Sequence, residues 1–138
     1  MDDDLWMARC LELAKQAGDT GNTPIGTIIV FPGGDTIEAL EAVPAGPDPF
    51  GHAEVIAVRD AVREFGRRLP VGTTLYTNAE PCFMCAFAIR EAKITRVVID
   101  RPTPEIGSVS SPYPILLAED IPRWGSAPEV VWWKTQEE

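Results

Sequence analysis

Two groups of metal-binding side chains, about thirty residues apart, constrain the fold of this chain more than any other sequence feature. The first is His52-Ala53-Glu54 and the second is Pro81-Cys82-Phe83-Met84-Cys85. Histidine and cysteine at such spacings are typical zinc ligands, and three of them leave a fourth coordination position open for water. If His52, Cys82 and Cys85 bind one Zn²⁺ ion, the fold must bring two distant segments together.

Each group stands where a helix is expected to begin. Cys82 and Cys85 are three residues apart, so their sulfurs share one face of a first helical turn. His52 and Glu54 can both lean toward a point just beyond the end of their own helix. The positive ends of two helix dipoles would then meet at the ion and stabilise negative charge there. The backbone N–H of Cys82 is in turn expected to support negative charge that develops during a reaction.

Glu54 is not required as a metal ligand and is predicted to be the catalytic residue. Zinc lowers the pKa of a bound water from about 16 to about 7. A neighbouring carboxylate can take a proton from this water and pass it to a ring nitrogen and then to a leaving amine. The pattern H-x-E followed by P-C-x-x-C is typical of nucleobase deamination. A structural zinc site would need four protein ligands, and Cys10 is predicted to be a buried apolar residue instead.

Length and charge limit the possible classes of protein. The 138 residues, of which 45% are hydrophobic, suit one soluble domain spanning 1–138. The chain shows no apolar run of membrane-spanning length and no signal peptide, so a cytoplasmic location is expected. A net charge of −9 disfavours tight binding to nucleic acid. Four arginines late in one helix (Arg59, Arg63, Arg67 and Arg68) fit a solvated outer face at least as well as a binding patch.

Hydrophobic periodicity and turn residues predict an alternation of helices and strands. Helices are expected at about 4–17, 53–65 and 82–92, with a short one from about 112 to 120. Strands are expected at 25–31, 36–43, 73–77, 97–99 and 130–133, the first two forming a hairpin around the turn at 32–35. This order predicts an α/β fold, a three-layer α/β/α sandwich with a mixed, mainly five-stranded sheet.

The chain resembles the cytidine deaminase-like superfamily, in the branch of guanine deaminases, fungal-type cytosine deaminases and tRNA adenosine deaminases. The resemblance covers about Leu5 to Asp100. Besides the two metal-binding groups, it rests on Thr23-Pro24-Ile25-Gly26, Asp48-Pro49 and Ala79-Glu80. It implies the α/β/α fold, one zinc ion per chain, and a homodimer in which the partner helps to shape the pocket.

One departure from the resemblance concerns substrate binding. Relatives often have an asparagine eleven residues before the zinc histidine, where it hydrogen-bonds the substrate, and this chain has Glu41. Asparagine donates and accepts, whereas an ionised glutamate only accepts. Glu41 and Ala53 are the predicted substrate-binding residues, and Glu41 should favour a ring that displays N–H groups. The alternative is that Glu41 is an exposed strand residue and the register is slightly shifted.

The end of the chain departs as well. The segment 101–138 lacks the longer, often basic terminal helix expected of a tRNA-editing relative. It contains Trp124, Trp132 and Trp133, but adjacent residues of a strand point to opposite faces. At least one of the last two is therefore expected in the core or in a dimer interface, and the three are not interpreted as a base-stacking platform.

These observations lead to one expectation and two alternatives. We expect a zinc-dependent aminohydrolase that releases ammonia from a small heterocycle, most simply a free guanine-like or isocytosine-like nucleobase. The first alternative is a tRNA-specific adenosine deaminase, against which the acidic charge and the missing basic tail count. The second is a non-catalytic zinc-binding partner protein, which would have no use for Glu54.

Overall fold

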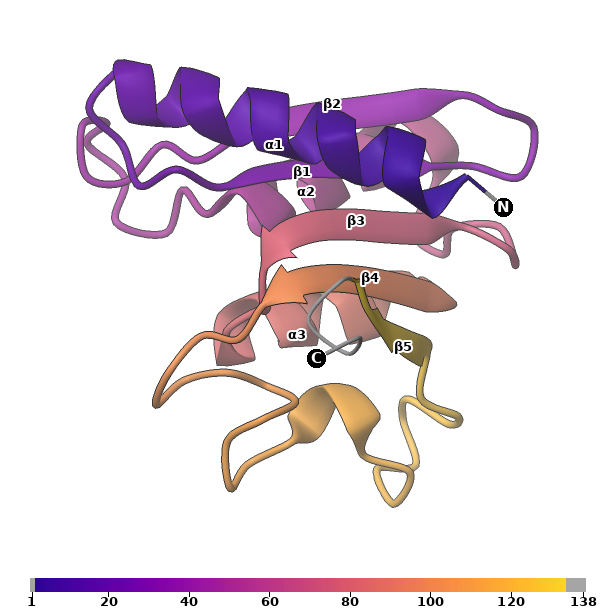
Figure 1. Cartoon of the computed structure of the whole chain (residues 1–138). Coiled ribbons are helices and arrows are strands. Elements are labelled where there is room, and N and C mark those ends of the chain that lie inside the picture. The colour runs from indigo at the N-terminus through magenta and orange to yellow at the C-terminus, as the bar shows by residue number, and fades with distance from the viewer. Residues whose placement is uncertain (1, 134–138) are drawn as a thin grey trace.

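A five-stranded mixed sheet forms the middle layer of the computed structural model, which describes residues 2–133 (Figure 1). The strands are β1 (Gly26–Val30), β2 (Thr36–Leu40), β3 (Thr74–Ala79), β4 (Arg96–Arg101) and β5 (Glu129–Trp132), in the order β2-β1-β3-β4-β5. Strand β1 is antiparallel to both β2 and β3, whereas β4 and β5 continue the sheet in parallel with β3. The predicted hairpin and mixed sheet are confirmed.

Helices cover both faces of the sheet, as predicted. Helix α1 (Asp3–Asp19) crosses one face, over β1 and β3, whereas α2 (Ala53–Phe65) and α3 (Phe83–Ala92) lie side by side on the other face (Figure 1). Both helices of that pair begin at the same end of the molecule, where the metal-binding groups lie. None of the described helices combines the length and the apolar character that crossing a bilayer requires.

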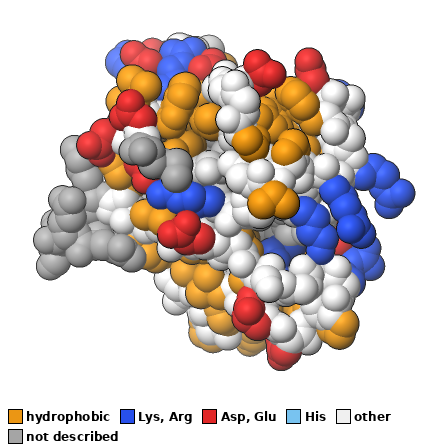
Figure 2. All heavy atoms as spheres, turned by 90° about the vertical axis from the view of Figure 1, so that its right-hand side faces the viewer, with side chains coloured by type: hydrophobic (Ala, Val, Ile, Leu, Met, Phe, Trp, Pro, Cys, Tyr) orange, Lys and Arg blue, Asp and Glu red, His pale blue; other side chains and the backbone are white. Residues whose placement is uncertain are grey.

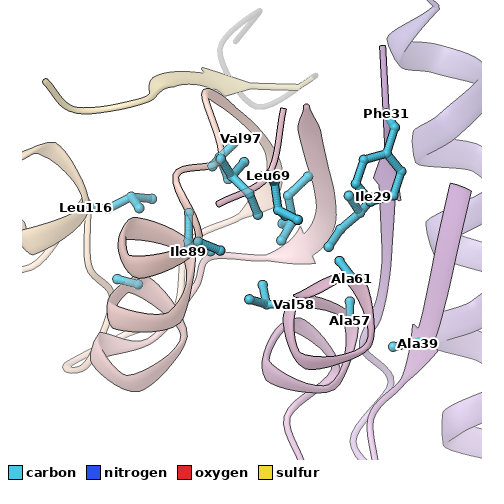
Figure 3. Packing of buried hydrophobic residues seen from close by; sticks show 14 of the residues in the cluster. Ile29, Phe31, Ala39, Ala57, Val58, Ala61, Leu69, Ile89, Val97 and Leu116 are labelled. Carbon is cyan, nitrogen blue, oxygen red and sulfur yellow. The ribbon is translucent and has the colours of Figure 1, made fainter. Parts of the chain in front are cut away.

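Two hydrophobic clusters hold the layers together. The larger cluster fills the space between the sheet and the helix pair formed by α2 and α3. It includes Ile29, Ala57, Ile89 and Val97 (Figure 3). The smaller one lies under α1 and consists of Met7, Cys10, Ile28, Tyr76 and Val98. Neighbouring strand residues point to opposite clusters, which explains why consecutive residues of β3 and of the middle of β4 are buried rather than alternately exposed. Cys10 is fully buried, as predicted.

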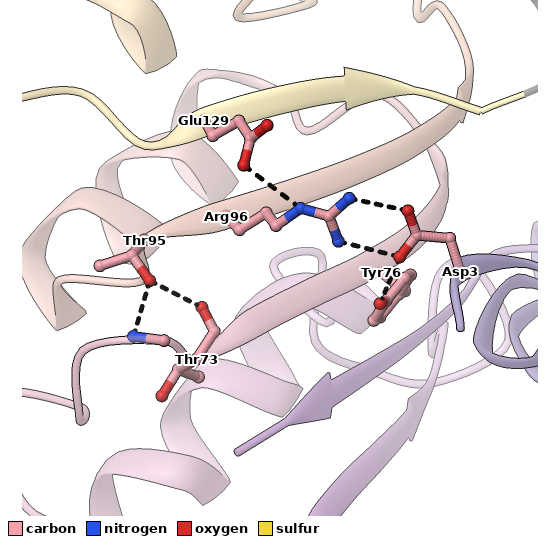
Figure 4. A network of polar contacts seen from close by, with 7 residues as sticks. Asp3, Thr73, Tyr76, Thr95, Arg96 and Glu129 are labelled. Carbon is pink, nitrogen blue, oxygen red and sulfur yellow. Dashed lines mark hydrogen bonds and ion pairs between the residues drawn. The ribbon is translucent and has the colours of Figure 1, made fainter. Parts of the chain in front are cut away.

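A polar network fastens the start of α1 to the sheet (Figure 4). The Arg96 guanidinium donates to both carboxylate oxygens of Asp3 at 2.8 and 2.7 Å. The Tyr76 hydroxyl donates to Asp3 at 2.6 Å, and Glu129 lies 3.3 Å from the Arg96 Nε. Further along, Gly26 lies so close to α1 that an added Cβ would be 2.5 Å from the Cβ of Leu13. This contact explains why a glycine opens β1.

The chain differs from prediction mainly after Asp100. The helix expected at 112–120 is only a 3-10 turn, η1 (Ile115–Leu117), within a long connection. Pro114 contributes to this, because the residue before a proline disfavours helical geometry, so the turn starts only after Pro114. Strand β2 also ends earlier than the predicted 43, since the N–H of Ala42 bonds to the carbonyl of Gly51 rather than to the sheet. Trp132 packs on the larger cluster and Trp133 on the smaller, in agreement with their predicted opposite orientations.

Candidate zinc site and active site

Three potential metal ligands meet where α2 and α3 begin. The Nδ1 atom of His52 lies 3.5 Å from the sulfur of Cys82 and 3.5 Å from that of Cys85, and the two sulfurs are 3.5 Å apart. Tetrahedral zinc, with bonds of about 2.3 Å to sulfur and 2.0 Å to nitrogen, would place such atoms about 3.5 to 3.8 Å apart. The three side chains therefore fit one Zn²⁺ ion.

Local backbone geometry explains this convergence. His52 is the N-cap of α2 and Cys82 the N-cap of α3, both with extended backbone, and Cys85 lies on the first turn of α3. The carbonyls of His52 and Cys82 accept the first helical hydrogen bonds, from Ile56 and Ala86. Sequence spacing alone predicted both helix starts. That the two helix starts lie close together is a result of tertiary structure.

The thiol chemistry also suits a cation. The pKa of Cys82 is lowered to about 5, because its sulfur is hydrogen-bonded by the Cys85 thiol and by N–H groups at the start of α3. The pKa of Cys85 is raised, because its thiol is hydrogen-bonded to Cys82 and because it is buried. Two thiolates this close repel each other, and a divalent cation between them removes that penalty.

Glu54 lies beside these ligands and is 3% exposed. Its Oε2 accepts a hydrogen bond from the Thr77 hydroxyl at 3.1 Å, and its Oε1 lies 3.8 Å from the sulfur of Cys85. Burial raises the pKa of Glu54 to about 7, and the negative charge of Glu41 contributes to this. A nearby zinc ion would lower that pKa again. In the metal-free protein the pKa of this carboxylate is therefore near neutral, in the range of a group that exchanges protons.

Glu41 is buried, so the alternative of an exposed strand residue is wrong. It follows the last residue of β2, and its Oε1 accepts a 2.8 Å hydrogen bond from the N–H of Ala53 at the start of α2. Burial raises its pKa. Its second oxygen accepts no hydrogen bond from residues 2–133. The substrate-binding roles of Glu41 and Ala53 remain predictions, and in this structure the Ala53 N–H is occupied by Glu41.

Three polar residues around the site had no predicted role, although Glu80 is part of the family resemblance. Thr77 holds the Glu54 carboxylate. Asn78 is buried at the end of β3 and bridges the N–H of Gly26 and the carbonyl of Pro24. Glu80 is 2% exposed and binds the segment after β4. All three precede Pro81. The sequence feature that could have identified them is a run of polar residues at the end of a predicted strand.

Comparison with known proteins agrees with this geometry. Residues 1–100 match the model of the cytidine and deoxycytidylate deaminase zinc-binding region. A tRNA-specific adenosine deaminase of Aquifex aeolicus is 35% identical over 106 residues, which are 77% of this chain and 70% of that protein. Among the other curated relatives, the matched share of their own length varies from 8% to 78%.

Solved structures are similar over most of the chain. One comes from biochemical and structural studies of A-to-I editing by tRNA:A34 deaminases at the wobble position. It has a TM-score of 0.81 and 31% identity, covering 96% of this chain and 99% of that one. Guanine deaminase from Bacillus subtilis has a TM-score of 0.68 and 34% identity, covering 74% of this chain and 66% of its own.

A single explanation accounts for the three converging ligands, the carboxylate beside them and the family match over residues 1–100. This chain belongs to the cytidine and deoxycytidylate deaminase zinc-binding family, and it is a zinc-dependent hydrolytic deaminase.

Proposed function

We propose that this chain deaminates adenosine in tRNA to inosine. The observation that carries this proposal is the similarity to a tRNA:A34 deaminase structure across nearly the full length of both chains. Several curated tRNA-specific adenosine deaminases at 32–38% identity support it. This substrate was only the first alternative from the sequence, which favoured a free nucleobase. The proposal includes a cytoplasmic location, because tRNA is used there.

The geometry suits hydrolysis at C6 of adenine. His52, Cys82 and Cys85 would hold zinc, which when bound supplies an activated water at neutral pH. Glu54 takes one proton from the attacking water and delivers it to N1 of the ring, where it stays, and it then passes the second water proton, from the new hydroxyl on C6, to the departing amine. The C–N bond to the exocyclic amine breaks, ammonia leaves, and a carbonyl remains at C6. The N–H of Cys82, the N-cap of α3, would support the negative charge that develops in the reaction.

The decisive experiment measures inosine in tRNA after incubation with the zinc-loaded protein. We expect inosine at a single anticodon position, and no ammonia from free adenine. Replacing the proton carrier with Glu54→Gln should lower kcat by about 10²–10⁴-fold, while zinc stays bound because Glu54 is not a ligand. Wild-type rates in the E54Q protein would contradict the proposed role of Glu54.

A free aminated base remains the second candidate, and Glu41 is the observation that favours it. This buried carboxylate beside the site accepts hydrogen bonds only, so it suits a ring edge that displays N–H groups, such as that of guanine. An ammonia-release assay with guanine and isocytosine, run beside the tRNA assay, separates the two. Turnover of guanine with no inosine in tRNA would replace the first proposal by this one.

We also propose that the chain forms a homodimer. Phe87 and Tyr113 are 51% and 67% exposed, and both lie on the α3 side of the molecule, against Trp124 and Phe83 respectively. Large exposed apolar side chains near one another mark interaction surfaces, and a second copy is the occupant we infer. Sedimentation equilibrium should give twice the chain mass, and Phe87→Asp should shift it toward the monomer.

A further inference from the structure

The carboxylate of Glu80 is surrounded by hydrogen-bond donors. Its Oε1 accepts from the N–H of Thr103 at 3.0 Å and from the hydroxyl of Ser110 at 2.7 Å. Its Oε2 accepts from the N–H groups of Val109 and Ser110, both at 2.7 Å. A carboxylate has about four acceptor positions, so all of them are used. Every donor comes from residues 103–110, which we call the 103–110 loop.

The same loop also holds the backbone of the zinc-binding turn. The carbonyl of Pro81 accepts from the N–H of Ser108 at 3.0 Å and from its hydroxyl at 2.6 Å. Cys82 forms an isolated antiparallel bridge with Gly107. Glu80 and Pro81 are therefore hydrogen-bonded to the 103–110 loop, and Cys82, which is a zinc ligand, is paired with Gly107 of the same loop.

Gly107 permits this arrangement. An added Cβ at this position would lie 2.5 Å or less from all three atoms of the Glu80 carboxylate group. The loop backbone thus passes directly against the carboxylate, and only a residue without a side chain fits there. The contact is between the loop and Glu80 itself, not merely between the loop and the zinc-binding turn.

We propose that Glu80 is a positioning residue for the zinc site. Through the 103–110 loop it holds the turn at Pro81 and Cys82, so that the Cys82 sulfur stays at ligand distance from His52 and Cys85. Partners that orient metal ligands commonly change metal affinity about 10–100-fold when they are removed. A purely structural role would affect unfolding but not the rate at which zinc leaves the folded protein.

Zinc release to a coloured chelator tests this role without any substrate, and so does not depend on which amine is deaminated. In Glu80→Gln an NH₂ group in the position of Oε1 can donate to the Ser110 hydroxyl but faces the Thr103 N–H, so at least one hydrogen bond is lost. We expect release about 10–100-fold faster than in the parent. The matched control is Glu91→Gln, a carboxylate near the C-terminal end of α3 that accepts three hydrogen bonds, from Arg123 and Trp124, and none from the 103–110 loop.

A second, milder variant keeps the test informative if Glu80→Gln fails to fold. Ser110→Ala removes one of the four donors, and we expect release a few-fold faster than in the parent. If both variants stay folded by circular dichroism and release zinc at the parent's rate, the proposal is overturned, even if their melting temperatures fall. Release accelerated equally by E91Q would also overturn it.

A double-mutant cycle tests the direct contact. Gly107→Ala should accelerate zinc release in the parent, because the new Cβ displaces the carboxylate. In a Glu80→Ala background the carboxylate is gone and the Cβ has room, so the same change should add little. Strictly additive effects on the release rate would show that Gly107 and Glu80 act independently, and would contradict the proposed positioning.

Discussion

At the residue scale, the site depends on two buried carboxylates with different surroundings. Glu54 lies beside the zinc ligands and is bonded by Thr77, whereas Glu41 binds the N–H of Ala53 at the start of α2. Each raises the cost of ionising the other, because like charges in a buried site repel. Glu54 must be ionised to accept a proton from water, and the positive charge of a bound zinc ion would offset this repulsion.

The raised pKa of Glu54 predicts how pH affects the metal-free protein. Below a pH of about 4.5, Glu54 is protonated in both the folded and the unfolded chain. Between pH 4.5 and about 7, Glu54 is ionised in the unfolded chain but remains largely protonated in the folded one. The folded state binds more protons in this window, so the free energy of unfolding should fall as pH rises from 4.5 to about 7.

Urea unfolding of the chelated protein at pH 5 and pH 7.5 measures this effect. In Glu54→Gln the titrating group is absent, so its stability should depend less on pH over the same window. Equal pH dependence in the two proteins would show that Glu54 ionises in the folded chain as readily as in the unfolded one.

At the scale of elements, function depends on the N-termini of α2 and α3 on one face of the sheet. It depends also on α1, which is fastened to the other face. The buried face of α1 covers β1 and β3, and β3 ends at the polar residues that support the zinc-binding turn. The start of α1 is held by Asp3 through Arg96 and Tyr76, on side chains that are mostly shielded from water. Hydrogen bonds between charged groups in such places are worth more than surface ion pairs.

Replacing Asp3 should therefore destabilise the fold. We expect Asp3→Ala to lower the free energy of unfolding by about 2–3 kcal/mol, since Arg96 and the Tyr76 hydroxyl lose their partner. The control, Glu38→Ala, removes an ion pair with Arg9 on the more exposed outer side of α1, and should cost less than about 1 kcal/mol. Chemical denaturation of both variants measures the difference, and equal losses would argue against a special role for the Asp3 network.

At the scale of the whole molecule, charge is strongly segregated. The chain has a net charge of −9, yet six lysines and arginines, besides the buried Arg90, lie near the C-terminal ends of α2 and α3. They are Arg59, Arg63, Arg67, Arg68, Lys93 and Arg123, and we call them the basic cluster. Figure 2 shows lysines and arginines gathered along one edge of the face viewed from the right of Figure 1. Arg67, Arg68, Lys93 and Arg123 line a hollow of about 420 Å³.

If the substrate is tRNA, the basic cluster is the surface that suits its phosphates. Arg67 and Arg68 form no ion pair within residues 2–133. They follow the C-terminal end of α2, a helix about 20 Å long at 1.5 Å per residue that begins beside His52. We expect Arg67→Gln with Arg68→Gln to weaken tRNA binding and to lower the slope of log affinity against log salt by about 1 to 2.

The matched control, Arg9→Gln with Lys15→Gln, changes the net charge equally at residues already paired on α1. It should leave the slope unchanged. Fluorescence anisotropy with labelled tRNA measures both double variants. The same slope in the parent and in the R67Q/R68Q protein would remove the basic cluster from RNA binding.

Much of the architecture could be predicted because it depends on short-range patterns. The bounds of α2 match the prediction residue for residue, since a helical apolar stripe begins after His52 and a glycine follows Phe65. The hairpin follows from two β-rich runs around a Pro-Gly-Gly turn. The segment from 102 to 128 was least predictable, because its structure comes from contacts with Glu80 and with Arg90 rather than from its own periodicity.

The sequence by itself determined the chemistry: one imidazole, two thiols and one carboxylate at spacings that suit two helix starts. Those spacings are local, and local geometry is encoded in neighbouring residues. Only the tertiary structure decided that Glu41 turns in to bind Ala53, that Glu80 holds the 103–110 loop, and that Arg67, Arg68, Lys93 and Arg123 line one hollow. These features join residues far apart along the chain, and their pairing depends on how the layers pack.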